Sequence, residues 1–390
     1  MNPNLDRLQP YPFSKLRSLK AGLKPADKPH IALAMGEPKH TPPAFVCDEL
    51  IKHLDKLPQY PPTRGIAPLR AAIANWLRAR FQLANVCAET QVLPVSGTRE
   101  GLFAFAQAMV STGSKVLMPN PFYQIYEGGA LLAGAKPHLV NCQAANGFKA
   151  DFAAVSAAVW HQCDLVYLCS PGNPTGAMLE AADFHQLIQL ADRYDFTIAA
   201  DECYSELYFD EGAPPVGLLQ ACEDIGRSDF RRCVVFHSLS KRSNLPGLRS
   251  GFVAGDAQLL EKFSLYRTYH GCAMPLYAQY ASVAAWRDEQ HVRQNRALYR
   301  EKFTTVLDIL NGCLDVERPQ AGFYLWPFVG DGEHFAKTLF RQQNITVLPG
   351  AYLARDSEGV NPGSSYVRIA LVATLQECVE AAQRIRTFCR

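Results

Sequence analysis

Short runs of consecutive apolar residues alternate with longer amphipathic stretches through the middle of the chain. The runs do not alternate with polar residues, which is typical of strands covered on both faces in a mostly parallel sheet. The predicted strands are 92–95, 115–118, 165–169, 196–200 and 233–236. Four stretches place apolar residues three and four positions apart, as helices do, at 100–110, 124–133, 152–160 and 180–193. The pattern predicts an open α/β sheet with helices on both faces.

The pattern changes after Pro275. Residues 276–311 are nearly free of Gly and Pro and predict one long helix that carries the chain into a second domain. Further strands are predicted at 322–326, 345–348 and 366–370, helices at 333–341 and 375–388, and one early strand at 31–34. We expect an N-terminal arm and first strand over 1–40 packed on the small domain, a large domain over 41–285, and a small C-terminal α/β domain over 286–390.

Composition narrows the class of protein. The chain has 390 residues, of which 48% are apolar and 19% charged, which suits two domains with large cores and excludes disorder, collagen and coiled coil. A formal net charge of +2 provides no broad basic field for nucleic acid or an anionic membrane, so we expect a small-molecule partner. The sequence shows neither a membrane span nor a secretory signal, so we expect a cytoplasmic protein.

The twelve cysteines form no C-x-x-C pair, and the closest two, Cys163 and Cys169, are six positions apart. Most of the cysteines lie inside apolar runs, where a reduced thiol packs as a small hydrophobe. Because disulfides are rare in the cytosol, we predict neither disulfides nor a metal site.

Polar residues follow four of the predicted strands at the point where each strand ends. In open parallel sheets, ligands bind beyond the carboxyl ends of the strands. The four polar turns are 96–101, 170–176, 201–204 and 237–242. We expect them to meet at one edge of the sheet.

The side chains in these turns suit one cofactor. A lysine in a cleft loses its proton more readily than in water, so Lys241 would act as a nucleophilic amine. Asp201, at the end of a buried strand, calls for a cation. Gly97 and Thr98 open a helix whose free N–H groups attract an anion, and Ser238 and Arg249 add donors for the same anion. An amine for an aldehyde, a partner for a cation and a phosphate cradle together describe pyridoxal phosphate (PLP).

These motifs resemble those of the class I/II aminotransferases, which have the PLP-dependent transferase fold of type I. The resemblance rests on five strings in this order: Ser96-Gly97-Thr98, Asn173-Pro174-Thr175-Gly176, Asp201-Glu202-x-Tyr204, Ser238-x-x-Lys241 with Gly247-x-Arg249, and Tyr366-Val367-Arg368. Each string alone is weak, but together they cover the chain from about Tyr11 to its end. The resemblance implies a homodimer with shared active sites, acting on amino acids and 2-oxo acids.

The resemblance also implies roles for the catalytic residues. Lys241 binds the cofactor as a Schiff base and, once displaced, moves the proton between the substrate and the cofactor. Asp201 keeps the pyridine nitrogen protonated, and Tyr204 and Asn173 donate to the ring's 3′ oxygen. The ordinary alternatives are a surface lysine, a helix-capping aspartate and, for Asn173, simple turn chemistry.

Other residues hold the rest of the cofactor by the same resemblance. Gly97, Thr98, Ser238 and Arg249 bind the phosphate, with Arg99 beside them, and Tyr60 of the partner subunit joins them. Tyr123 stacks on the ring, although a lone aromatic residue is more often part of a core.

The resemblance also implies which residues bind the substrate's α-carboxylate. Arg368 grips it, the backbone at Gly36 approaches it, and Asn173 completes the clamp. An arginine on a strand near the C-terminus is otherwise usually a surface residue.

Longer strings at 8–13, 36–40, 120–128 and 266–271 resemble bacterial N-succinyldiaminopimelate aminotransferases. That resemblance implies exchange of the amine of N-succinyl-LL-2,6-diaminopimelate with 2-oxoglutarate, a step of lysine biosynthesis. Extra carboxylates on these substrates call for cations, and we expect Arg99, with Lys39 on the loop beside Gly36, to supply them. Arg99 is equally compatible with a plain surface arginine.

Three alternatives remain open from the sequence. A broad aspartate- or alanine-type aminotransferase and a PLP-dependent C–S lyase share the same catalytic set. A PLP-sensing regulator would need a DNA-binding segment, and only about thirty residues precede the first predicted strand. The segment Arg242-Ser243-Asn244 departs from the commonest family pattern, in which smaller or aromatic residues follow the lysine.

Overall fold

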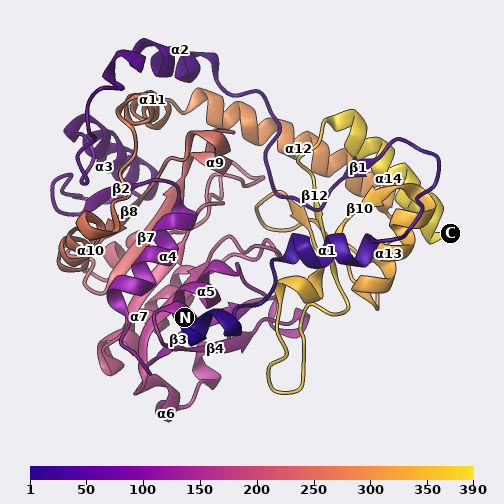
Figure 1. Cartoon of the computed structure of the whole chain (residues 1–390), viewed down its shortest axis with the longest axis horizontal. Coiled ribbons are helices and arrows are strands. Elements are labelled where there is room, and N and C mark those ends of the chain that lie inside the picture. Colours follow the sequence, from indigo (N-terminus) through magenta and orange to yellow (C-terminus); the bar gives the residue numbers. More distant parts are fainter.

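The computed structural model describes residues 1–390, and its larger part is built on one seven-stranded sheet. The strand order is β2-β8-β7-β6-β5-β3-β4, with helices on both faces (Figure 1). The strands are β2 (Val92–Val95), β3 (Lys115–Asn120), β4 (Lys136–Asn141), β5 (Cys163–Cys169), β6 (Thr197–Asp201), β7 (Cys233–Ser238) and β8 (Gly251–Gly255). Only β8 runs opposite to the other six strands, antiparallel to both β2 and β7. The predicted mostly parallel α/β sheet is confirmed.

The strands of this sheet are apolar on both faces because helices cover both. Leu165 and Tyr167 of β5 point into one core, whereas Val166 and Leu168 point into the other. The first face is covered by α4 (Thr98–Met109), α5 (Ile125–Leu132) and α10 (Ala257–His270). The second is covered by α3 (Ala67–Phe81), α7 (Ala181–Tyr194), α8 (Leu218–Asp224) and α11 (Leu276–Arg287), with α2 (Ala44–Lys52) packed on α11.

Two predicted helices are wrong in extent. Residues 152–160 form a short 3-10 turn, Phe152–Ala154, and then α6 (Ala157–Trp160). The predicted long helix 276–311 is two helices, because α11 ends at Arg287 and α12 (Gln290–Leu310) begins three residues later. At this break the guanidinium of Arg242 donates hydrogen bonds to the carbonyl oxygens of Ala285 and Asp288, at 2.8 and 3.1 Å. A distant side chain therefore replaces helical hydrogen bonds, which no local pattern reveals.

The C-terminal part is a smaller α/β unit. Its three-stranded antiparallel sheet has the order β11-β12-β9, and a separate parallel pair joins β1 to β10. The strands are β1 (Ile31–Ala32), β9 (Tyr324–Leu325), β10 (Ile345–Thr346), β11 (Leu348–Pro349) and β12 (Val367–Ala370), and the helices are α12, α13 (Gly332–Gln343) and α14 (Leu375–Cys389). The early strand β1 thus pairs with β10 of this unit. The domain boundaries at 40 and 285 stay predictions.

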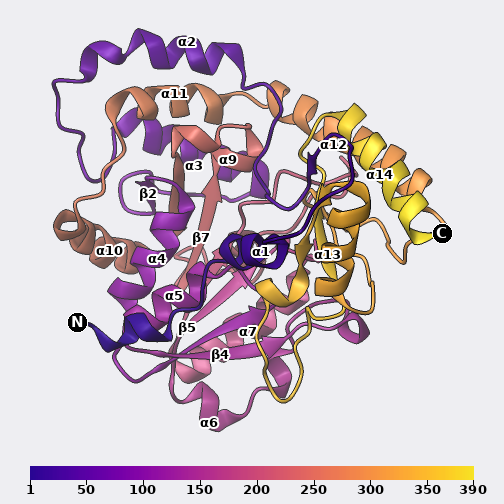
Figure 2. The same ribbon diagram turned by 45° about the vertical axis from the view of Figure 1, so that its right-hand side comes forward.

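The N-terminal segment bridges the two parts. Residues 3–7 lie against α5 of the large sheet, and α1 (Pro12–Lys20), which the sequence pattern does not predict, packs on α13 of the smaller unit. In Figure 2 this indigo segment crosses in front of the region where the two parts meet. It therefore covers the carboxyl edge of the large sheet.

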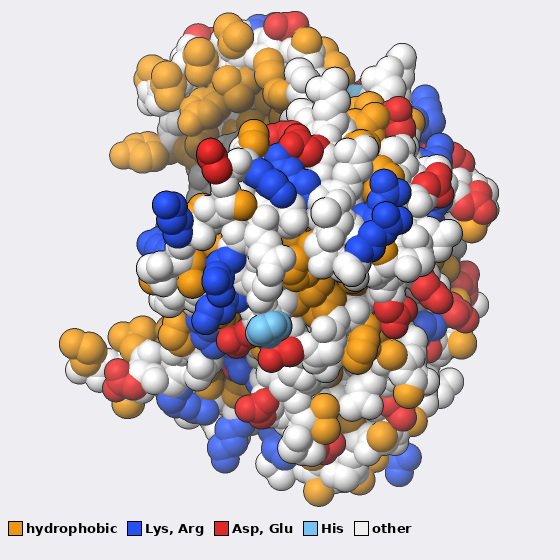
Figure 3. Space-filling model, turned by 90° about the vertical axis from the view of Figure 1, so that its right-hand side faces the viewer, with side chains coloured by type: hydrophobic (Ala, Val, Ile, Leu, Met, Phe, Trp, Pro, Cys, Tyr) orange, Lys and Arg blue, Asp and Glu red, His pale blue; other side chains and the backbone are white.

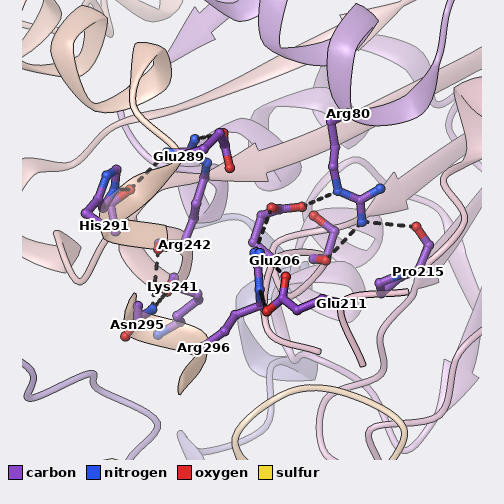
Figure 4. A network of polar contacts seen from close by, with 12 residues as sticks. Arg80, Glu206, Glu211, Pro215, Lys241, Arg242, Glu289, His291, Asn295 and Arg296 are labelled. Carbon is purple, nitrogen blue, oxygen red and sulfur yellow. Dashed lines mark hydrogen bonds and ion pairs between the residues drawn. The ribbon is translucent and has the colours of Figure 1, made fainter. Parts of the chain in front are cut away.

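A buried ion network also joins the two parts. The carboxylate of Glu206, only 3% exposed, pairs with Arg80 of α3 at 2.7 Å and lies 3.5 Å from Arg296 of α12 (Figure 4). Arg296 pairs in turn with Glu211 at 2.7 Å. Separating α12 from the large domain would leave the buried Glu206 carboxylate without one of its partners, which is costly. The cluster therefore favours the packing of α12 against the large domain.

The surface mixes charges of both signs in the view of Figure 3, with apolar side chains gathered at its top. Exposed apolar residues are concentrated on α2 and the segment after it: Phe45, Ile51, Leu54, Leu57 and Tyr60. None of the helices combines the length and the apolar character that crossing a bilayer requires.

Candidate active site

A cavity of about 450 Å³ lies at the carboxyl edge of the large sheet, where the smaller unit and the N-terminal segment close over it. Side chains from widely separated parts of the sequence line it. The predicted site residues among them are Gly36, Thr98, Arg99, Tyr123, Asn173, Asp201, Tyr204, Ser238, Lys241, Arg249 and Arg368. The four polar turns therefore do meet at one edge.

Lys241 stands in this cavity on α9 (Leu239–Arg242), which begins directly after β7. Its Nζ donates a hydrogen bond to the carbonyl oxygen of Gly36 at 2.6 Å. Burial lowers the pKa of Lys241 from 10.5 to about 8. The amine therefore loses its proton far more readily than an exposed lysine does, as a nucleophile requires.

Asp201 ends β6 and is 4% exposed. One carboxylate oxygen accepts from the Tyr126 hydroxyl at 2.7 Å, and the other accepts from the backbone N–H of Cys203 at 3.2 Å. Burial nevertheless raises the pKa of Asp201 above its ordinary value. A carboxylate in such a place is stabilised by a facing cation, so it fits a protonated pyridine nitrogen.

A cradle for an anion lies beside Asp201. Gly97 caps α4 with φ of 86°, and a Cβ built there would come within 2.1 Å of Nη2 of Arg249. The lack of a side chain at Gly97 is thus what lets the guanidinium approach the first turn of the helix. Thr98 and Ser238 line the same cavity, and Ser238 caps α9 by accepting from the N–H of Ser240 at 3.1 Å. Helix N–H groups, hydroxyls and a guanidinium fit a phosphate.

Arg368 is held in the opposite wall of the cavity by the smaller unit. It is 4% exposed on β12 and donates to Asn173 Oδ1 at 2.9 Å and to the Ala34 carbonyl at 2.7 Å. Its buried Nε has no partner. The guanidinium lies 4.4 Å from the ring centre of Tyr324, whose hydroxyl fills the space above Gly36. A buried cation with an unused donor fits a carboxylate ligand.

Two further donors face the cavity. The Tyr204 hydroxyl lies 3.0 Å from the Tyr324 hydroxyl, and burial holds the pKa of Tyr204 well above 10, so that the phenol keeps its proton. Because the amide oxygen of Asn173 is taken by Arg368, its nitrogen remains as a donor. Burial likewise raises the pKa of Tyr123, which lies edge-on to Tyr126 with ring centres 5.9 Å apart.

Arg99 lies exposed at the mouth of the cavity, with its guanidinium 5.5 Å from the ring centre of Tyr11. Two other predicted residues are not brought to the cavity. Lys39 lines a separate hollow together with His40 and Asn295, and Tyr60 is fully exposed. The structure therefore leaves Arg99 as the peripheral cation at this site.

Several residues in the cavity wall or directly behind it are not predicted from the sequence. Tyr126, Tyr324 and Cys203 contact Asp201, Arg368 and Thr98, respectively, across the fold. Tyr126 lies on α5, three positions after the predicted Tyr123, which precedes that helix. Nothing local marks Tyr324, which reads as an ordinary strand residue.

One group outside the cavity has donors suited to a metal ion. Ligand atoms of Glu100, His270 and Cys272 lie within 4.8 Å of one another. The Glu100 carboxylate already pairs with the fully buried guanidinium of Arg267, so an added cation would meet a positive charge. All twelve cysteines are unpaired.

Comparisons with known proteins agree with this geometry. Residues 28–385 match the family model of class I and II aminotransferases. An LL-diaminopimelate aminotransferase of Desulforudis audaxviator is 32% identical, with 97% of this chain and 95% of that protein aligned. An aminotransferase structure from Neisseria meningitidis is 49% identical over the full length of both chains, with a TM-score of 0.96. A probable N-succinyldiaminopimelate aminotransferase of Thermus thermophilus is 25% identical, covers 96% of this chain and 99% of its own, and has a TM-score of 0.84.

The family match spans most of the chain, and the cavity holds donors for each part of PLP. The chain therefore belongs to the class I and II aminotransferases and is a PLP-dependent enzyme.

Proposed function

We propose that this enzyme transfers the amine of N-succinyl-LL-2,6-diaminopimelate to 2-oxoglutarate. When bound, PLP supplies an aldehyde that captures the amine and a ring that accepts electrons from the α-carbon. In this proposal Lys241 holds the cofactor and moves the proton, Asp201 faces the ring nitrogen, and Tyr204 and Asn173 donate to the ring oxygen. Gly97, Thr98, Ser238 and Arg249 bind the phosphate.

One observation carries the choice of substrate, namely the charge of the cavity lining. Four cations line it, Arg99, Lys241, Arg249 and Arg368, against a single carboxylate, Asp201. In this proposal three of the cations already have partners: Arg249 binds the phosphate, Lys241 the aldehyde and Arg368 the substrate's α-carboxylate. Arg99 at the mouth remains for a distal carboxylate, so the cavity suits donors and acceptors that carry two or more acidic groups.

Free LL-diaminopimelate is the second candidate, because the 32% identical relative is named for it. That substrate carries a distal ammonium as well as a distal carboxylate. Apart from Asp201, the lining has no carboxylate that could bind an ammonium group. Succinylation removes this charge and adds an anion, so the lining favours the succinylated compound.

A panel of amino donors with 2-oxoglutarate tests the proposal. It should compare the succinylated and free diamino acids with glutamate, aspartate and alanine by kcat/KM. We expect the succinylated compound to be preferred by at least about tenfold, the value of one charged hydrogen bond. A preference for the free diamino acid would overturn the choice of substrate, and a flat profile would favour a broad aspartate- or alanine-type enzyme.

Arg99→Ala should raise KM for the succinylated donor and for glutamate by about tenfold and leave KM for alanine unchanged. The reason is that Arg99 has no role toward a substrate without a distal carboxylate. Arg193→Ala is the matched control, since Arg193 is also exposed and lies 5.2 Å from the ring centre of Tyr194, far along the chain on α7. Equal effects of Arg99→Ala on glutamate and alanine would refute the assignment.

Gly97→Ala should weaken PLP binding by about tenfold or more, as measured by titration of the apoprotein. A Cβ there collides with Arg249, whereas Gly113→Ala adds the same backbone strain at φ of 90° with nothing within 4 Å. Strain alone costs about 1–2 kcal/mol in both variants. If Gly113→Ala weakens PLP binding as much as Gly97→Ala, the loss does not come from the phosphate cradle.

We further propose a cytoplasmic homodimer in which Tyr60 enters the partner's site. Tyr60 is fully exposed within the row of apolar residues on and after α2, which Figure 3 shows as part of an apolar surface. Such a surface is costly to leave in water and suits burial in a two-fold interface.

A further inference from the structure

The segment after the catalytic lysine, Arg242-Ser243-Asn244, is buried rather than placed at the edge of the cavity. It belongs with α9, a helix of only four residues that cannot satisfy its own carbonyl groups. Two of these carbonyls, those of Lys241 and Arg242, accept hydrogen bonds from Nδ2 of Asn295 at 3.2 and 3.3 Å. Figure 4 shows Asn295 reaching from α12 to the lysine's helix.

The hydrogen bonds around Asn295 run in one direction. The Lys302 ammonium lies 2.6 Å from Nε2 of His40 and has only protons to offer, so Nε2 accepts and Nδ1 carries the proton. Nδ1 then donates to Oδ1 of Asn295 at 2.8 Å, and Asn244 donates to the same oxygen at 2.9 Å. Both donors of Asn295 are thereby directed at the backbone of Lys241 and Arg242.

His40 belongs to the loop that also contacts the two ends of the substrate site. The carbonyl of Ala34 accepts from Arg368, and the carbonyl of Gly36 accepts from Nζ of Lys241. The loop therefore contacts Lys241 in two ways. His40 reaches the lysine's backbone through Asn295, and the carbonyl of Gly36 accepts a hydrogen bond from its side chain. Burial and the neighbouring Lys302 lower the pKa of His40, which keeps the imidazole neutral and able to accept.

Arg242 fixes the far side of α9. Its buried guanidinium lies beside the adjoining rings of Trp76 and Trp286, 5.5 and 4.8 Å from their centres, and pairs with Glu289. The residue after Lys241 is thus anchored to the α11–α12 joint, as Figure 4 shows. This contact opposes rotation of α9 about its axis. The hydrogen bonds from Asn295 to the carbonyl groups of Lys241 and Arg242 then fix the position of the helix.

We propose that Asn295 is a positioning residue for Lys241 and that His40 orients it, so that the loop 34–40 and the lysine hold a fixed relation. The inference rests on the proposed role of Lys241. Borohydride reduction of the wild-type holoenzyme tests that role separately, because a cofactor that is not trapped on Lys241 would overturn the proposed function irrespective of Asn295.

Asn295→Ala in the holoenzyme should lower kcat about tenfold to hundredfold, since misplacing a reacting group by ~1 Å costs on the order of a hundredfold. KM for donor and acceptor should stay within about twofold of the wild type, because Asn295 does not line the cavity. The visible circular dichroism per bound cofactor should fall, since it reports how rigidly the lysine holds the ring. Gln294→Ala, on an exposed neighbour in α12, should change none of these.

His40→Phe keeps the ring packing on Tyr299, whose centre lies 4.5 Å away, but removes the proton given to Asn295. His40→Phe should lower kcat and the visible dichroism as Asn295→Ala does, but by a smaller amount. If Asn295→Ala does not fold, His40→Phe alone tests the positioning role. Unchanged kcat and dichroism in the folded variants would overturn the proposal. A lower melting temperature with unchanged kcat and dichroism would do so too, because it indicates a purely structural role.

Discussion

Lys241→Ala is expected to give a folded protein whose transamination rate is lower by on the order of 10⁴-fold or more. The cavity offers no other amine that can hold the cofactor and carry the proton at the α-carbon, since Lys241 is its only lysine. The measurement is a coupled assay with 2-oxoglutarate, together with mass spectrometry after borohydride reduction. The wild type should gain a reduced cofactor at Lys241, and the variant should gain none.

The stability of the apoprotein provides a control on this result. Because burial lowers the pKa of Lys241 to about 8, its protonated form is disfavoured in the folded state. This cost is fully present below about pH 8 and disappears as the pH rises toward 10.5, where the unfolded chain also loses the proton. Lys241→Ala should therefore not lower the melting temperature at pH 7, and Lys262→Ala, on an exposed residue of α10, should leave activity unchanged. Retained turnover in Lys241→Ala would refute the assignment.

Arg368→Ala is expected to lower kcat/KM by on the order of 10²–10³-fold for every amino donor and 2-oxo acid. The expectation follows from the buried, partly unpaired guanidinium, because loss of one member of a buried charged pair costs about 2–5 kcal/mol. Every substrate carries the α-carboxylate, so the loss should be alike for acidic and neutral donors, in contrast to Arg99→Ala.

Arg368→Lys separates charge from geometry. Lysine keeps the charge but lacks the fork that bonds Asn173 and Ala34 at once, so it should restore only a small part of the rate. Cofactor absorbance should be the same in both variants, because Arg368 is placed on the side of the substrate. A variant that loses cofactor before it loses substrate affinity would contradict this placement.

The sequence pattern predicted the central strands and did not reveal two others. The strands β5, β6 and β7 are found because both of their faces are apolar, which produces continuous apolar runs. In contrast, β8 begins and ends with glycine, which weakens a strand pattern, and β4 at the sheet edge contains lysine, proline and histidine. Local composition hides these strands, and only their neighbours in the sheet stabilise them.

The same distinction holds for the cavity. Residues at strand ends, such as Asp201 and Lys241, are visible in the sequence because a polar turn interrupts an apolar run. Tyr324, Tyr126 and Asn295 act through contacts between distant segments, and each lies in an otherwise ordinary strand or helix. Likewise Arg242 is an unusual residue in the pattern, but its partners at the α11–α12 joint emerge only in three dimensions.

The antiparallel course of β8 has a consequence for engineering this enzyme. Ser238 at the end of β7 pairs with Gly251 at the start of β8, so residues 239–250 form a closed excursion that leaves the sheet and returns to it at the same edge. Lys241 and Arg249 both lie on it, and their separation is set by its contour. Insertions or deletions there would displace Lys241 and Arg249 relative to each other, whereas substitutions at Tyr11 or Arg99, which lie outside this segment, leave that spacing intact. Libraries for altered specificity should keep the length of 239–250 fixed and diversify those two positions.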